Sequence, residues 1–467
     1  MKLFYTLLLS IIAYGSYSQK ETCNWYFGSQ SAVSFCAGTP VNMGGSSMIQ
    51  LEGCASVSNT NGDLLFYTNG VTVYNKLNQV MMNGTGLMGH QSSTHSALIV
   101  PNPGNANHYY IFTADAGPYE NPPNDGFRYS LVDMTMDNGN GAVITTHKNI
   151  LLMDSCTEKI AATLHGNGTD YWVVTHRWKS NAFYAYTISA SGIGAPVISS
   201  TGSFHTGNDD NTIGQMKFNP QGNKLALAVY LDGYYELFEF DNNTGAVFNP
   251  VQLNIPTNIS SYGVEFSPSG SLLYVTTAFF GEVYQFDISS GNAQQIQASM
   301  MQVGMSAVTN GSFQLAIDGK IYLAHDNPIT QGHAYLSVIE NPDAAGPACS
   351  FSYNNFYLGN SKSLLGLPSF PSNYFLPLGI PESTTGNSAL NIYQHDGLLL
   401  VEWNAVKSES VLFEIFDLTG KAIWKENLNQ TIGLNRFSIP LSETGLYLLR
   451  ISGGKTSLSE KFMLLKR

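Results

Sequence analysis

Charged residues are scarce in this sequence, and basic ones are the scarcer kind. Only 12% of the 467 residues are Asp, Glu, Lys or Arg, and 21 basic residues stand against 33 acidic ones. No basic stripe is available to neutralise phosphates, so we expect no nucleic-acid partner. Long apolar runs are also missing. The run at residues 3–13 falls well below the roughly 20 residues that span a bilayer, so we expect no transmembrane segment.

The familiar catalytic and metal-binding motifs are absent as well. The sequence has no Gly-x-Ser-x-Gly elbow, no His-Glu-x-x-His and no paired Cys-x-x-Cys. The commonest hydrolase, zincin and zinc-ribbon assignments therefore lack support. We assign no catalytic residue from motifs.

The first residues resemble a secretory signal peptide. Lys2 supplies a positive charge, residues 3–13 form a short apolar run, and residues 16–18 are Ser-Tyr-Ser. This pattern predicts a signal peptide at residues 1–18 that is cleaved before Gln19.

The mature chain keeps five cysteines, and export permits disulfides, although the odd count leaves at least one thiol unpaired. Spacing alone does not fix the pairing. A bond from Cys23 or Cys36 to Cys349 would tie distant parts of the chain together, and buried free thiols are the alternative.

Turn-forming residues and β-favouring aromatics are abundant, with 45 Gly, 26 Tyr and 25 Phe. This composition predicts an all-β chain. One pattern, a turn glycine followed by an aliphatic and aromatic run, recurs six times, at Gly62, Gly104, Gly168, Gly222, Gly270 and Gly319. The steps between these glycines are 42, 64, 54, 48 and 49 residues, which fits one four-stranded β-propeller blade each.

About 50 residues per blade predict about seven blades between residues 23 and 375, with six as the rival count. We expect the missing blade to straddle the two ends of the ring. Residues 25–28 would pair with strands near 351–375, which removes exposed sheet edges.

The sequence divides further along the chain. Residues 19–376 form the predicted propeller, and Pro, Gly, Ser and Thr at residues 377–387 predict a linker. Residues 388–467 carry about seven short apolar or alternating runs, which predict a small Ig-like β-sandwich.

This C-terminal segment resembles the type A sorting domain of type IX secretion in Bacteroidota. The matching features are residues 415–421 (IFDLTGK), residues 441–447 (LSETGLY) and a basic end. Its motif residues are Gly445, Tyr447, Lys466 and Arg467. The resemblance implies recognition by the type IX machinery, release or attachment at the outer cell surface, and removal of the tail after export.

The larger segment resembles a family of secreted repeat proteins from the same bacteria. The resemblance rests on residues 25–28 (WYFG), 52–56 (EGCAS), 92–101 (SSTHSALIVP) and 366–370 (GLPSF). The phrase at residues 267–275 is similar to one in YVTN-type and WD-type repeats. The resemblance implies a propeller and no particular activity.

In a propeller, the first strand of each blade lines the central tunnel, so polar residues near these strands converge. The candidate binding residues are Glu52, His95, Glu158, His165, Gln215, Glu265 and Gln314. His165 and Glu158 could act as acid and base, or with Glu265 as ligands of a cation. We favour the alternative, in which these groups satisfy backbone and water in a wet channel.

Residues 208–211 (Asn-Asp-Asp-Asn) could hold calcium, or form an ordinary turn, and we expect no other cofactor. The pattern as a whole predicts a secreted or cell-surface propeller that binds a glycan or a protein. The alternative is a tunnel-mouth hydrolase or lyase of the YVTN lactonase-like type.

Overall fold

The computed structural model describes residues 20–117, 126–257, 259–376, 390–395, 398–405, 407–417, 421–440, 445–453 and 457–464. The chain divides into two units, with the boundary between Pro377 and Leu378. Each unit is described by itself. The predicted signal peptide and linker, residues 1–18 and 377–387, lie outside the described residues.

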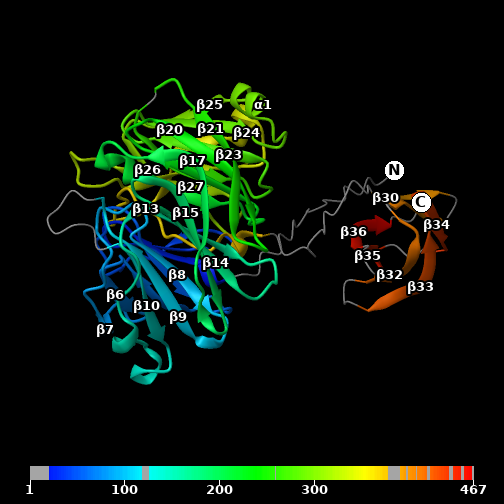
Figure 1. Ribbon diagram of the computed structural model, residues 1–467, viewed down its shortest axis with the longest axis horizontal. Coiled ribbons are helices and arrows are strands. Elements are labelled where there is room, and N and C mark those ends of the chain that lie inside the picture. Colours follow the sequence, from blue (N-terminus) through cyan, green and yellow to red (C-terminus); the bar gives the residue numbers. More distant parts are fainter. Residues whose placement is uncertain are drawn as a thin grey trace, which may run out of the picture. The chain divides into compact units, whose positions relative to one another are not determined.

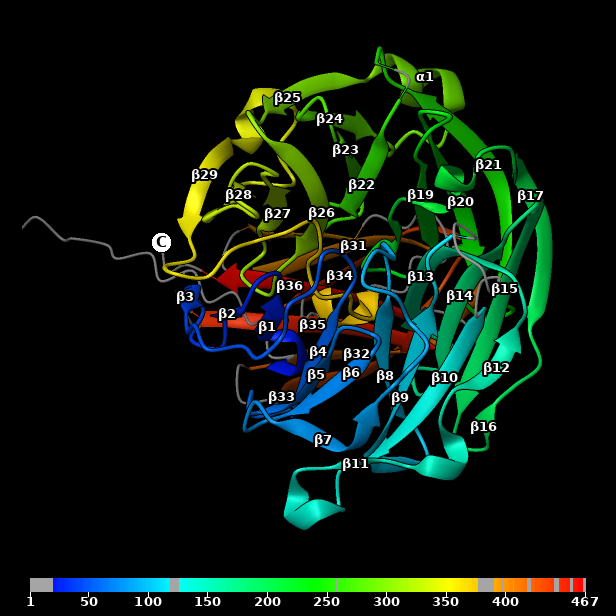
Figure 2. The ribbon, with the colours of Figure 1, turned by 90° about the vertical axis from the view of Figure 1, so that its left-hand side faces the viewer.

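The N-terminal unit is a ring of antiparallel sheets (Figure 1). Figure 2 shows these sheets following one another in sequence order around a central axis. Strands β4 to β12 are joined as one nine-stranded sheet, but the link is a single parallel residue pair between β7 and β11, Met82 with Ala142. Counting the two sides of that link separately, the described residues form a seven-bladed β-propeller.

The strands of the seven blades follow in chain order. Blade 1 contains β1 (Asn24–Phe27), β2 (Ser31–Ser34) and β3 (Val41–Asn42). Blade 2 contains β4 (Ala55–Ser58), β5 (Leu64–Thr68), β6 (Thr72–Asn75) and β7 (Val80–Thr85). Blade 3 contains β8 (Ala97–Asn102), β9 (Asn105–Ala114), β10 (Phe127–Asp133), β11 (Ala142–Val143) and β12 (Ile150–Met153). Blade 4 contains β13 (Cys156–Leu164), β14 (Tyr171–Arg177), β15 (Ser180–Ser189), β16 (Gly192–Ile193) and β17 (Val197–His205).

The last three blades have four strands each. Blade 5 contains β18 (Met216–Phe218), β19 (Lys224–Val229), β20 (Tyr234–Asp241) and β21 (Ala246–Asn254). Blade 6 contains β22 (Ser261–Phe266), β23 (Leu272–Thr277), β24 (Glu282–Asp287) and β25 (Met301–Met305). Blade 7 contains β26 (Thr309–Leu315), β27 (Ile321–Asp326), β28 (Tyr335–Ile339) and β29 (Phe351–Tyr357).

Helical structure in the described residues is limited to short segments. One α-helix, α1 (Ala293–Ala298), connects β24 to β25. The 3-10 turns are η1 (Lys20–Thr22), η2 (Asp137–Gly139), η3 (Thr145–His147), η4 (Asp209–Thr212), η5 (Gly346–Cys349) and η6 (Ser372–Phe375).

The six turn glycines of the sequence repeat all lie between the first and second strands of a blade, in blades 2 to 7. Gly222 and Gly270 show why glycine is needed there, since their φ angles of 67° and 72° are in the left-handed region that other residues rarely adopt. The predicted repeat therefore corresponds to one blade per copy.

The ring closes by joining its two ends. Ser29 and Lys362 exchange two backbone hydrogen bonds of 2.9 and 3.1 Å. Leu365 accepts a bond from the Ser312 amide at 2.7 Å and donates one to the Leu51 carbonyl at 2.8 Å. The chain from Lys362 onward therefore lies between the innermost strands of blades 7 and 2. The predicted closure is found, although residues 351–357 belong to blade 7 and not to the closing segment.

The cysteine pairing differs from the one considered first. Cys23 and Cys36 form a disulfide with a Cα–Cα distance of 5.0 Å, while Cys349 is free and buried. A bond to Cys349 is therefore wrong. The two bonded residues flank the antiparallel β1–β2 pair, and the Phe35 amide donates to the Cys23 carbonyl at 2.7 Å, so the hairpin itself brings them together.

Aromatic rings pack between the blades. Trp25 in β1 is fully buried, with its ring centroid 4.5 Å from that of Phe35 and 5.6 Å from that of Tyr322 in blade 7. Burying a large apolar side chain contributes roughly 1.5–3 kcal/mol. Such contacts hold each sheet against its neighbour and stabilise the ring.

The C-terminal unit is a β-sandwich, as expected. One sheet contains β30 (Leu390–His395), β31 (Leu398–Ala405) and β34 (Gly433–Ile439). The other contains β33 (Ala422–Gln430), β32 (Glu409–Phe416), β35 (Gly445–Gly453) and β36 (Ser457–Leu464). Both contribute to one core, in which Val401 and Trp403 of the first sheet join Phe413 and Ile451 of the second.

Candidate functional site

The first strands of blades 2 to 7 begin at one end of the axis, called here the upper end, and finish at the other, the lower end. Neighbouring first strands bond near their upper ends, as His95 N does with Glu158 O at 3.1 Å and Gln215 N with Tyr262 O at 2.8 Å. The axis thus collects polar residues that are far apart in the sequence.

At the upper end, Glu52 and Glu158 meet through Thr94. The Thr94 hydroxyl lies 3.4 Å from Glu52 Oε2 and 2.9 Å from Glu158 Oε2. The Tyr262 hydroxyl donates to Glu52 Oε2 at 2.7 Å. We call Glu52 and Glu158 the axial carboxylate pair.

Both carboxyl groups of this pair are buried and well supplied with donors. Glu158 accepts from the amides of Thr94 and Gly117 at 2.9 and 3.0 Å, and from the Thr212 hydroxyl at 3.4 Å. Burial raises the pKa of both groups, and for Glu52, where the neighbouring Glu158 charge adds to the effect, the pKa is about 8. Both carboxyl groups are therefore shifted toward their protonated forms.

Gln215 lies between the two ends and joins three blades. Its Oε1 accepts from the amides of Val264 and Phe313 at 3.2 and 2.9 Å, and its Nε2 donates to the Phe313 carbonyl at 3.2 Å. All of these partners are backbone groups, so the Gln215 side chain links the first strands of blades 5, 6 and 7.

At the lower end, Glu265 and Gln314 flank Lys217, which the sequence analysis missed. Lys217 Nζ lies 3.5 Å from Glu265 Oε2 and donates to Gln314 Oε1. Its position in the sequence could have indicated it, because Lys217 is two residues beyond Gln215 and side chains two apart on a strand share a face.

These residues line a cavity at the lower end, called here the lower cavity. Its volume of ≈ 20 Å³ leaves room for about one water molecule. Its polar lining residues are six, namely His95, Lys217, Glu265, Gln314, Ser369 and Ser372. The remaining wall includes the apolar side chains Leu98, Ile160, Met216, Phe218, Phe370 and Phe375.

His165 does not join the other candidates. It follows the last residue of β13, in the turn to β14, where its ring stacks on Trp172 with centroids 5.2 Å apart. Its Nδ1 accepts from the Asn167 amide at 3.0 Å. Glu158 lies near the opposite end of the same strand, so pairing the two as acid and base is ruled out by the length of β13.

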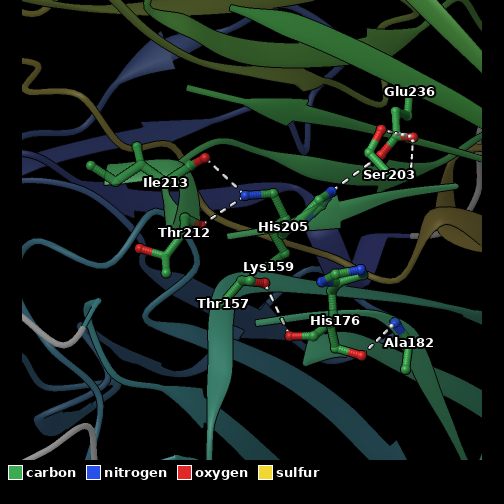
Figure 3. Close-up of polar contacts among 10 residues, drawn as sticks. Thr157, Lys159, His176, Ala182, Ser203, His205, Thr212, Ile213 and Glu236 are labelled. Atoms are coloured by element: carbon green, nitrogen blue, oxygen red, sulfur yellow. Dashed lines mark hydrogen bonds and ion pairs between the residues drawn. The ribbon is translucent and has the colours of Figure 1, made fainter. Parts of the chain in front are cut away.

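A second buried polar group, missed by the sequence analysis, lies off the axis between blades 4 and 5 (Figure 3). We call Lys159, His176, His205 and Glu236 the blade 4–5 cluster. His205 Nε2 is 3.2 Å from Glu236 Oε2, and the ring centroids of the two histidines are 3.9 Å apart. Lys159 Nζ donates to the carbonyls of Thr212 and Ile213 at 2.7 and 2.8 Å.

Burial dominates the electrostatics of this cluster. It lowers the pKa of both histidines well below 6.5 and that of Lys159 to about 7. Both nitrogens of His176 and Nδ1 of His205 have no hydrogen-bond partner among the described residues. The two rings are therefore neutral and incompletely bonded.

Within the described part of the chain, no group of three or more His, Cys, Asp or Glu side chains is arranged to hold a metal ion. The oxygen-rich residues 208–211 are the N-cap and the first three residues of η4. Asn208 caps this turn by accepting from the Asp210 amide at 2.9 Å, and Asn211 Oδ1 accepts from the amides of Leu231 and Asp232 at 3.1 and 2.9 Å. These contacts serve the turn itself.

In the C-terminal unit, Gly445 begins β35 and Tyr447 is buried in the sandwich core, whereas Lys466 and Arg467 lie outside the described residues. No helix in the described ranges is long and apolar enough to cross a membrane.

Comparison with known families and proteins gives one assignment. Residues 395–465 match the family described as secretion system C-terminal sorting domain. This match implies engagement with type IX secretion and export out of the cell. A search of curated proteins found no match.

Three solved structures are among those similar to this chain. A protein from Lactobacillus plantarum is 11% identical with a TM-score of 0.39, covering 89% of this chain and 99% of that one. The periplasmic gluconolactonase PpgL of Pseudomonas aeruginosa is 14% identical with a TM-score of 0.37, covering 81% and 94%. A putative 6-phosphogluconolactonase from Bacteroides uniformis is 14% identical with a TM-score of 0.36, covering 83% and 98%. Likenesses this distant carry no activity to this chain.

Proposed function

We propose that this protein is a binding propeller, directed to the outer cell surface or the medium by a signal peptide at residues 1–18 and a type IX sorting domain at 388–467, and that it binds a glycan at the upper end of the axis. The observation that carries the binding site is a row of aromatic rings that leads from the surface to the axial carboxylate pair.

The row begins on the β23–β24 turn. Phe279 is 71% exposed, and its ring centroid is 6.2 Å from that of Tyr230. Tyr230 in turn lies 6.4 Å from Tyr262, whose hydroxyl bonds Glu52. The turn is at the upper end, because the Ala278 amide donates to the Ser260 carbonyl at 2.8 Å, directly before β22.

This arrangement suits a sugar. An exposed ring presents an apolar face to the C–H face of a pyranose, and a neighbouring phenol can exchange hydrogen bonds with its hydroxyl groups. Tyr230 supplies the phenol. Burial, together with the nearby carboxyl groups of Asp210 and Glu52, raises its pKa to about 12, so the hydroxyl stays protonated and can both donate and accept.

The test is binding of the mature chain to a panel of bacterial and host glycans, with affinities measured by calorimetry. We expect Phe279→Ala to weaken binding about twofold to tenfold, since losing one stacked ring costs roughly 0.5–1.5 kcal/mol. The matched control is Phe248→Ala, which removes another exposed ring (42% exposed) from the outer strand β21 and should leave binding unchanged. Binding of a protein partner and of no glycan would refute the glycan assignment.

Export has a separate test. Deletion of residues 388–467 should leave the propeller folded but held in the periplasm, because the signal peptide alone directs it across the inner membrane. Normal delivery of the shortened protein to the surface or medium would refute the sorting role.

A tunnel hydrolase or lyase is the second candidate, and the axial carboxylate pair is the observation that favours it, since two neighbouring carboxyl groups with raised pKa values are the kind of groups that serve as acid and base. Turnover of a lactone, ester or glycan that Glu158→Gln abolishes would establish it in place of simple binding.

A further inference from the structure

A groove lies between the outer strands of blades 7 and 1, and we call it the rim groove. It is lined by residues 357–361 at the end of β29, by residues 42–46 at the end of β3, and by Gln30 in the β1–β2 turn. Figure 2 shows β29 and β3 side by side. The groove has a volume of ≈ 720 Å³, within the range of roughly 300–1,000 Å³ that is usual for small-molecule sites.

The rim groove is at the upper end of the axis. Gln30 N donates to Met48 O at 2.9 Å and Gln50 N donates to Gly28 O at 3.0 Å, so the β1–β2 turn lies beside the chain that leads to Glu52. The row of aromatic rings that begins at Phe279 belongs to blades 5 and 6. The groove is therefore a separate feature of the same end.

The lining of the rim groove is polar and uncharged. Among the described residues that line it, none is Asp, Glu, Lys, Arg or His. Its polar side chains are those of Gln30, Asn42, Ser46, Tyr357, Asn360 and Ser361. A side-chain amide both donates and accepts hydrogen bonds. The lining thus suits an uncharged ligand whose groups also do both.

Several of these polar groups have no partner within the described part of the protein. The Gln30 and Asn360 side chains are exposed and make no hydrogen bond there. Asn42 uses Oδ1 to accept from the Gly44 amide at 3.0 Å, which leaves its Nδ2 free to donate. The floor between them is open, because a Cβ built on Gly44 or Gly45 would meet no atom within 4 Å.

Tyr357 gives the rim groove an apolar surface. Its side chain is 54% exposed, and its ring centroid is 5.0 Å from that of Tyr335 in β28. The neighbouring ring supports Tyr357 on one side and leaves much of its surface to solvent. A supported, exposed ring of this kind packs against the C–H face of a pyranose.

We propose that the rim groove binds an uncharged oligosaccharide, with one sugar ring packed on Tyr357 and the sugar hydroxyls bonded to the amides of Gln30, Asn42 and Asn360. Sugar hydroxyls donate and accept as the amides do, and a neutral sugar needs no counter-ion. This site goes beyond the glycan site proposed at Phe279, because different blades form it and either site can exist without the other.

Calorimetry on the mature full-length protein tests the proposal, with cellohexaose, maltohexaose and mannohexaose as probes and a galacturonic acid hexamer as the charged reference. We expect saturable binding of at least one neutral hexaose and weaker binding of the charged one. Tyr357→Ala should weaken the binding about twofold to tenfold through loss of the packed ring. Asn360→Ala should weaken it by a similar factor through loss of an amide at an exposed position.

The matched control is Phe248→Ala, which removes an exposed ring from the outer strand β21 of blade 5, away from the groove lining. This variant should keep the wild-type affinity. If Phe279→Ala weakens hexaose binding and the two groove variants do not, the sugar is bound at the aromatic row, so the rim-groove proposal fails while the proposed function stands.

Three other results would overturn the proposal. They are the absence of binding by all three neutral hexaoses, equal affinity for the charged hexamer, and binding of an uncharged Ser/Gly octapeptide in place of any sugar.

Discussion

Two clusters of polar side chains are buried in the propeller, and they differ in how many of their polar atoms have hydrogen-bond partners. In the axial carboxylate pair, Glu52 and Glu158 have hydrogen-bond donors on every carboxylate oxygen. In the blade 4–5 cluster, three imidazole nitrogens have no partner in the described part of the chain. In the axial network, removing one residue leaves several buried partners without a hydrogen bond. In the blade 4–5 cluster, the free-energy cost of unpaired buried atoms is already present in the wild-type protein. The axial network should therefore stabilise the folded protein, and the blade 4–5 cluster should destabilise it.

The largest effect should come from Glu158→Ala. Truncation leaves the amides of Thr94 and Gly117 buried without an acceptor, which should lower the free energy of unfolding by about 3–5 kcal/mol. Denaturant unfolding of the full-length protein measures it. Glu158→Gln keeps an acceptor oxygen and should lose less than half as much; equal losses would mean that these bonds contribute little.

The difference in the free energy of unfolding between the wild-type protein and Glu52→Gln should depend on pH. Its pKa is 4.5 when unfolded and about 8 when folded, so its contribution is fully present below pH 4.5 and is lost as pH rises through 8. Relative to Glu52→Gln, the wild-type protein should lose about 1.4 kcal/mol of stability per pH unit between these values. Unfolding curves at pH 5, 6 and 7 measure the difference. A difference that is independent of pH would contradict the raised pKa.

The smallest effect, and the one of opposite sign, is expected for His176→Phe. Replacing a buried ring that has two unpaired nitrogens with an apolar ring should raise the free energy of unfolding at pH 7.5 by about 1 kcal/mol. The gain should grow as pH falls below 6.5, because the folded pKa of His176 lies well below that of the unfolded chain and the unfolded state takes up the proton first.

The control for that variant is His205→Phe in the same cluster. It removes the partner of Glu236 Oε2 and should destabilise the protein at the same pH. Stabilisation by both variants would show that the hydrogen bond between His205 and Glu236 contributes nothing.

Local sequence patterns were sufficient to predict the fold, because each turn or strand depends on only a few neighbouring residues. Gly222 and Gly270 mark turns that need a left-handed backbone, and the runs after them are the second strands of blades 5 and 6. The same reasoning placed Glu52, Glu158, Gln215, Glu265 and Gln314 around the axis, because a residue near a first strand faces the tunnel whichever blade it comes from.

The same reasoning failed where position along a strand decides the outcome. His165 was grouped with Glu158 although the length of β13 separates them. Lys217 stands between two apolar residues, Met216 and Phe218, and Lys159 of blade 4 lies near Glu236 of blade 5 only because the two blades pack together. Contacts between blades depend on registers and twists that no single segment encodes.

By itself, the sequence determined the all-β composition, the blade repeat, the sandwich and the sorting motif at the end of the chain, because turns, strand periodicity and short motifs are properties of neighbouring residues. Only the tertiary structure decided which thiols pair and which buried groups are satisfied. The disulfide depends on the register of the β1–β2 hairpin, and the buried groups depend on distances of a few ångströms between side chains that the packing of strands and neighbouring blades brings together.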